Sequence, residues 1–193
     1  MRSLFPISVE PPDIPAIPGL KYLPEFITPN EESQLVAGID ALPWDASWER
    51  RRQPYGGSYG RGAESVPAIP EWGRVLADRI FSAGLTERPF DHVLVNEYHP
   101  GQGIALHVDY EPFDRTVASL SLLAPCVMEF RKIANDARTS LLLERRSLLV
   151  LSDEARYEWQ HGIARRKNDR WQGIVIPRQR RISITFRTRV RSA

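Results

Sequence analysis

The second half of the chain is a succession of short segments in which apolar and polar residues alternate. A period of two predicts half-buried strands, because neighbouring side chains of a strand point to opposite faces of its sheet. We expect strands at residues 90–98, 116–123, 127–132, 140–143, 147–152, 173–176 and 181–188.

Helical spacing of apolar residues occurs earlier in the chain. Thr28 and Glu31, with Pro29 at the first helical position, are typical of a capping box and predict a helix through Leu42. A second helix is expected from about residue 70 to 81 or 83, where Gly84 ends it. Two helices followed by a run of strands predict an α+β fold whose sheet folds into a sandwich or barrel.

The start of the chain is rich in proline, which excludes regular helix there. We expect residues 1–27 to form an extended arm or a loose tail, and residues 28–193 to form one domain. The prolines of this segment and of the first helical turn are Pro6, Pro11, Pro12, Pro15, Pro18, Pro24 and Pro29.

Composition narrows the class of protein. A chain of 193 residues that is 42% hydrophobic can bury a substantial core, and no apolar run is long enough to span a membrane. The start lacks the pattern of a secretory signal, and Cys126 is the single cysteine, which excludes a disulfide scaffold and a thiolate zinc site. We therefore expect a reducing compartment, the cytoplasm or, in a eukaryote, the nucleus, and no membrane partner. We also expect the protein to be a monomer.

His107 and Asp109 stand two positions apart, so on an extended chain both side chains leave the same face. Such a pair suits a metal, although it also occurs as an ordinary hydrogen-bonded pair. His161, followed by Gly162, is the best third ligand. His92 and His99 are expected to be packing or exposed residues, with His99 an outside candidate. Two histidines and one carboxylate leave positions open on an iron, and zinc would accept the same ligands.

The last predicted strand has one apolar face and one cationic face. Ile182, Ile184 and Phe186 share the first, whereas the second carries Arg181, Ser183, Thr185 and Arg187. Buried arginines need a carboxylate or a hydrated partner, and a dicarboxylate cosubstrate would be such a partner. An exposed edge strand is the alternative, but Asn96 and Tyr98 share a face of another strand and could donate to the same carboxylates.

With N-x-Y-x-P-G at residues 96–101, H-x-D at 107–109, H-G at 161–162 and R-x5-R at 181–187, in this order, the chain resembles the AlkB family of iron- and 2-oxoglutarate-dependent dioxygenases. The resemblance covers about residues 90–188 and implies a double-stranded β-helix, or jelly roll, with the N-terminal helices packed on its sheet. It implies Fe(II), 2-oxoglutarate and O₂ as cofactor and cosubstrates, used to hydroxylate a C–H bond or to remove an N-methyl group as formaldehyde. The implied iron ligands are His107, Asp109 and His161. The implied partners of the distal carboxylate of 2-oxoglutarate are Arg181 and Tyr98. The resemblance places Asn96 and the catalytic Arg187 near the metal-chelating end of 2-oxoglutarate.

The substrate is predicted from a loop and from charge. Residues 165–193 hold ten basic residues against the single acid Asp169, and the loop at 50–62 could close over a nucleotide. We expect a modified base in DNA or RNA as substrate, in repair or RNA modification; residues 142–163 look most like family members that oxidise tRNA wobble uridines or methylated bases. Pro54 and Gly57 depart from the usual loop pattern, which leaves a protein side chain, a small molecule, or a non-catalytic binding module as alternatives. The candidate substrate contacts are Arg51, Arg52, Tyr55 and Tyr59, with Arg50 and Arg61 in the same loop.

Overall fold

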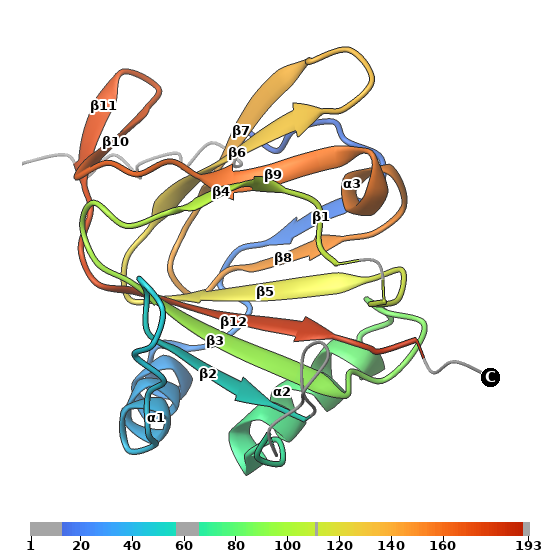
Figure 1. Cartoon of the computed structure of the whole chain (residues 1–193), viewed down its shortest axis with the longest axis vertical. Helices are drawn as coiled ribbons and strands as arrows, with labels where there is room; N and C mark the ends of the chain where they lie inside the picture. Colours follow the sequence, from blue (N-terminus) through green and yellow to red (C-terminus); the bar gives the residue numbers. More distant parts are fainter. Residues whose placement is uncertain (1–12, 57–65, 111, 191–193) are drawn as a thin grey trace, which may run out of the picture.

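The computed structural model describes residues 13–56, 66–110 and 112–190 and contains two facing antiparallel sheets (Figure 1). The larger sheet has the order β1-β8-β5-β12-β3-β2, and the smaller has the order β4-β9-β6-β7. This is the predicted jelly roll. The strands of the larger sheet are β1 (Leu20–Leu23), β2 (Arg52–Tyr55), β3 (His92–Tyr98), β5 (Val117–Leu122), β8 (Leu148–Leu151) and β12 (Arg181–Arg187). Those of the smaller sheet are β4 (Ile104–His107), β6 (Cys126–Lys132), β7 (Arg138–Leu143) and β9 (Trp159–Ile163).

Two helices, α1 (Pro29–Asp40) and α2 (Glu71–Ser82), cover the side of the larger sheet that faces away from the smaller one (Figure 1). Thr28 caps α1 with the predicted capping box: the backbone amide of Glu31 donates to Thr28 Oγ1, and the amide of Thr28 donates to the Glu31 carboxylate. Gly84, at φ +67°, follows the end of α2. No helix in the described ranges has the length and apolar character to cross a membrane.

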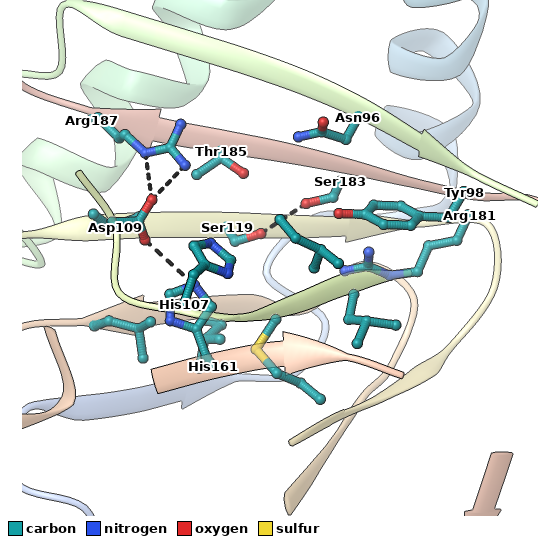
Figure 2. A pocket seen from close by; sticks show the side chains of 16 residues that line it. Asn96, Tyr98, His107, Asp109, Ser119, His161, Arg181, Ser183, Thr185 and Arg187 are labelled. Carbon is teal, nitrogen blue, oxygen red and sulfur yellow. Dashed lines mark hydrogen bonds and ion pairs between the residues drawn. The ribbon is translucent and has the colours of Figure 1, made fainter. Parts of the chain in front are cut away.

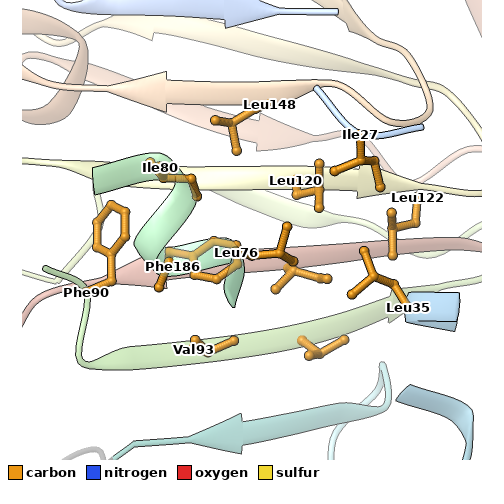
Figure 3. Packing of buried hydrophobic residues seen from close by; sticks show 14 of the residues in the cluster. Ile27, Leu35, Leu76, Ile80, Phe90, Val93, Leu120, Leu122, Leu148 and Phe186 are labelled. Carbon is orange, nitrogen blue, oxygen red and sulfur yellow. The ribbon is translucent and has the colours of Figure 1, made fainter. Parts of the chain in front are cut away.

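Each face of the larger sheet packs against a different layer. The outward face joins α1 and α2 in one apolar cluster, where Leu35 and Leu76 from the helices meet Val93, Leu120 and Phe186 from the strands (Figure 3). A second cluster fills the space between the two sheets. The apolar face of β12 therefore points to the helices, and its cationic face points between the sheets.

Several elements lie where the sequence predicted none. The strand β1 falls inside the predicted arm and pairs with β8. Residues 20–23 of that arm are therefore part of the larger sheet. The strand β2 falls inside the segment 50–62, for which the sequence predicted a loop or short hairpin, and among the described residues it pairs with the edge of β3 rather than within that segment. The sequence also missed β4, β9, the short helix α3 (Asp153–Tyr157) and β10 (Asn168–Trp171), which forms a separate hairpin with β11 (Ile174–Pro177).

Candidate metal centre

Two strands of the smaller sheet bring the predicted metal ligands together. His107 ends β4 and lies directly opposite His161 of β9 in the strand register. Asp109 follows two residues later, and one ligand atom from each of the three residues lies within 4.8 Å of the others. All three side chains line the cavity between the sheets (Figure 2).

Gly162 explains how β9 approaches β4 so closely. A Cβ atom at this position would lie 2.9 Å from both the carbonyl oxygen of Ile104 and the amide nitrogen of Leu106. Any larger residue would therefore push the two ligand-bearing strands apart. The Nδ1 atom of His107 is 2.9 Å from the carbonyl oxygen of Ala105, and a donated hydrogen bond there leaves Nε2 as the ligand atom.

Asp109 is buried and has only one of its carboxylate oxygens occupied by hydrogen bonds. Nε and Nη2 of Arg187 both donate to Oδ1, at 2.9 and 2.6 Å, whereas Oδ2 has no hydrogen-bond partner among the described residues. Oδ2 lies 3.4 Å from Nε2 of His161. A buried carboxylate oxygen left without a donor, beside two imidazoles, fits a bound cation.

The protonation states also suit a metal. Burial raises the pKa of Asp109, but the positive charge of Arg187 and the neighbouring His161 outweigh this effect and hold its pKa at about 2. Burial lowers the pKa of His161 to about 4, even though Asp109 opposes the shift. At neutral pH the site therefore holds an ionised carboxylate and a neutral imidazole, the forms that bind a metal.

Arg181 marks the other end of the cavity (Figure 2). It is 3% exposed, and its Nη2 donates to Oγ of Ser121 at 2.8 Å. Its Nε and Nη1 are buried without a partner in the described part of the chain, and its guanidinium carbon lies 5.5 Å from the centroid of the Tyr98 ring. Two unused donors on a buried cation fit the carboxylate of a bound dicarboxylate.

The polar faces of β3 and β12 form one wall of the cavity. Arg181 lies opposite Tyr98 in the strand register, and Ser183 lies opposite Asn96. Oγ of Ser183 is 3.0 Å from Oγ of Ser119 on the neighbouring strand β5. The sequence analysis missed Ser119 and Ser121, although two serines at alternate positions of an apolar strand are a signal for a polar wall.

The remaining histidines lie outside the cluster. His92 is fully buried, its ring lies 5.0 Å from that of Phe113, and burial lowers its pKa to about 3. His99 is half exposed, and its Nε2 is 3.1 Å from the carboxylate of Glu97. The structure thus agrees with packing and surface roles for these two residues.

The arginines of the predicted substrate loop have different partners. Arg51 is bound by the buried carboxylate of Glu97, and Arg52 by Asp45. Arg50 makes no ion pair with an acid in the described ranges. Its Nε donates to Oδ1 of Asn96 at 3.3 Å and its guanidinium carbon lies 5.5 Å from the Tyr98 ring centroid, which places it beside the cavity.

The prediction that Tyr55 contacts the substrate is wrong. Its ring is 5% exposed and packs edge-on against Trp72 of α2, with the ring centroids 5.9 Å apart. The alternation of β2 points this side chain into the core rather than toward a ligand. Tyr59 and Arg61 lie outside the described residues.

Comparison with known proteins identifies the family. Residues 41–187 match the model of the 2OG-Fe(II) oxygenase superfamily. The chain belongs to this superfamily. As the sequence predicted, it is a 2-oxoglutarate-dependent dioxygenase, and its cofactor and cosubstrates are Fe(II), 2-oxoglutarate and O₂.

Relatives of this dioxygenase confirm the resemblance to the AlkB family. It is 37% identical to the "Alkylated DNA repair protein ALKBH8 homolog" of Arabidopsis thaliana, over 89% of this chain and 58% of the plant protein. It is 28% identical to the "Probable RNA/DNA demethylase ALKBH6" of Danio rerio, over 89% of this chain and 86% of the fish protein. The chain thus spans less than two thirds of the plant relative.

A solved structure confirms the fold. The structure of OsALKBH1 superimposes with a TM-score of 0.70 at 20% sequence identity, covering 89% of this chain and 99% of the other. At this identity the likeness concerns the jelly roll alone.

Proposed function

We propose that this dioxygenase oxidises a modified base in DNA or RNA, with His107, Asp109 and His161 as its iron ligands. The observation that carries the proposal is the cavity itself. In the described part of the chain, one carboxylate oxygen at one end accepts no hydrogen bond, and two guanidinium nitrogens at the other end donate none. His107, Asp109 and His161 would hold iron at the first end, where with 2-oxoglutarate and O₂ it would supply the oxidant for hydroxylation of a nearby C–H bond.

The protein residues hold the cosubstrate and the metal ligand in place. Arg181 binds the distal carboxylate of 2-oxoglutarate with its Nε and Nη1 donors, and the hydroxyl of Tyr98 adds a neutral donor. Asn96 lies on the same wall, opposite Ser183 in the strand register, and its side chain is proposed to contact the chelating end of 2-oxoglutarate. Arg187 does not need to contact 2-oxoglutarate to be essential, because it orients Asp109.

Nucleic acid as the substrate is supported by charge and by relatives. Arg50 lies beside the cavity, and among the described residues no acid forms an ion pair with Arg50 or with Lys167 and Arg170 of the β10–β11 hairpin region. Cations that no acid neutralises are available to phosphates. The plant and fish relatives are named for DNA repair and RNA/DNA demethylation. We also propose that the protein acts as a monomer in the cytoplasm or nucleus.

Mass spectrometry of methylated oligonucleotides tests the proposal. Single- and double-stranded DNA and RNA are incubated with the protein, Fe(II), ascorbate and 2-oxoglutarate, and the expected result is an oxidised or demethylated base with succinate formed in equal amount. The Asp109→Asn variant is the matched control. Conversion of 2-oxoglutarate without change in any oligonucleotide would overturn the nucleic-acid substrate and favour a protein side chain or small molecule. Absence of iron-dependent succinate altogether would overturn the metal site.

A further inference from the structure

A buried arginine that the sequence analysis did not single out contacts the backbone around one proposed iron ligand. Arg156 lies in α3 and is 1% exposed. Its Nη1 donates to the carbonyl oxygen of Asp109 at 2.9 Å. Its Nη2 donates to the carbonyl oxygens of Tyr110 at 3.1 Å and Phe113 at 3.2 Å. One guanidinium group therefore binds three carbonyls, those of Asp109, Tyr110 and Phe113.

Arg156 also lies close in sequence to a second proposed metal ligand, His161. The helix α3 leads directly into β9, so Arg156 stands five residues before His161. The two elements also pack against each other. Arg156 thus connects the segment that carries Asp109 to the segment that carries His161.

The segment that holds Asp109 lacks the support of a strand ladder. The strand β4 ends at His107, and its pairing with β9 is already irregular between Ile104 and His107. Beyond His107 the chain has no regular pairing until β5 in the described residues, apart from an isolated bridge at Phe113. Hydrogen bonds from Arg156 take the place of the missing ladder at the point where a ligand must be held in position.

We propose that Arg156 is a positioning residue that sets the separation of Asp109 and His161 in the metal site. It holds the main chain of Asp109, whereas Arg187 holds the Oδ1 atom of its side chain. Together the two arginines fix both ends of this residue and direct Oδ2 into the cavity. Outer contacts of this kind orient metal ligands, and their loss typically lowers metal affinity about 10- to 100-fold.

A metal titration tests the inference, which rests on the proposed metal site but not on the substrate. Arg156→Lys keeps the charge but loses the planar fork that reaches three carbonyls. We expect it to bind Mn(II), in the presence of 2-oxoglutarate, about tenfold or more weakly than the unaltered protein, measured by calorimetry at a temperature where circular dichroism shows it folded. Arg156→Gln, which retains an amide donor and buries no charge, serves where the lysine variant does not fold.

Arg146→Lys is the matched control. Arg146 is also largely enclosed, with a side chain 15% exposed, but it binds Glu25 and Glu32, and none of these three residues lines the cavity. Its substitution is expected to lower the melting temperature and leave Mn(II) affinity unchanged. If the Arg156 variants lose stability but bind Mn(II) as tightly as the unaltered protein, Arg156 is a structural residue and the inference is wrong.

A measurement on the unaltered protein covers the case in which both variants fail to fold. Loading with diamagnetic Zn(II) should slow solvent exchange of the Arg156 guanidinium protons, observed by NMR, because a bound cation fixes the Asp109 turn that they support. The guanidinium protons of Arg146 should exchange at the same rate with and without Zn(II). Equal exchange at Arg156 in the two states overturns the inference. Failure of the unaltered protein to bind any metal would instead overturn the proposed metal site.

Discussion

Arg187 binds only one carboxylate oxygen of Asp109: two nitrogens of its guanidinium group donate to Oδ1, and none donates to Oδ2. The pairing leaves Asp109 one oxygen for a metal and sets the direction in which that oxygen points. Arg187 ends β12, and Arg181 begins the same strand on the same face. One strand therefore controls both the proposed metal ligand and the proposed binding point of the dicarboxylate.

Asp109→Asn should abolish iron-dependent succinate formation. The amide removes the negative charge but keeps an oxygen that can accept from Arg187. Asp109→Ala should also destabilise the fold, by about 3 to 5 kcal/mol, because it leaves Arg187 buried without its carboxylate. Succinate assays and thermal melts of the two variants separate these effects. Turnover by Asp109→Asn at the unaltered rate would contradict the ligand assignment.

Arg181→Lys should raise the 2-oxoglutarate concentration needed for half-maximal activity by tenfold or more. An ammonium group cannot present two parallel donors to a carboxylate, and breaking a buried charged pair typically costs a few kcal/mol. In this variant we expect the apparent KM for 2-oxoglutarate to rise and kcat to change less. Ser121→Ala, which removes only the hydrogen bond to Nη2, is the milder comparison. An unchanged KM in Arg181→Lys would exclude contact with 2-oxoglutarate.

Arg50→Ala should weaken oligonucleotide binding and reduce its dependence on salt. Removal of one phosphate-binding cation makes the slope of log affinity against log salt shallower by about 0.9 for duplex DNA. Decarboxylation of 2-oxoglutarate without substrate should persist, because the metal ligands are untouched. Arg52→Ala is the control, since Asp45 and the Trp48 ring already engage that guanidinium. Equal salt slopes in both variants would place Arg50 outside the nucleic-acid interface.

Acid should destabilise the fold through Glu97. Burial raises the pKa of this carboxyl group, but hydrogen bonds from Arg51 and Arg180 outweigh it and hold the pKa at about 2, below the ordinary 4.5. A depressed pKa contributes stability above pH 4.5 that is lost as the pH falls toward 2. Chemical denaturation between pH 7 and 3 should show a smaller pH dependence in Glu97→Gln. Identical pH profiles would mean that Glu97 does not contribute.

The sequence predicted the chemistry of the site better than its surroundings. Alternation on β12 and β3 correctly assigned faces, because the period of a strand is fixed by its backbone. Alternation does not name a strand's neighbours, so the sequence could not reveal that β2 pairs with β3 and points Tyr55 inward. The partner of Arg51 was hidden for the same reason, since only this pairing brings Glu97 beside it.

Backbone contacts were also beyond prediction. The carbonyls that bind Arg156 belong to three residues whose side chains take no part in these hydrogen bonds. No pattern of residue types marks such acceptors. The chain is irregular after His107 because the pairing of β4 with β9 ends there. The end of this pairing depends on contacts with β9 rather than on the local sequence.

The strand order has a consequence for how the chain folds during its synthesis on the ribosome. β12, the last of the described strands in chain order, lies between β5 and β3 in the larger sheet. β1 can pair only after β8 has been synthesised. Until β12 emerges, β5 and β3 each expose an unpaired strand edge, and such edges invite association between chains. Folding dominated by contacts between distant residues is also slow. Nascent chains stalled before residue 181 should therefore depend on chaperones more than chains in which β12 is complete.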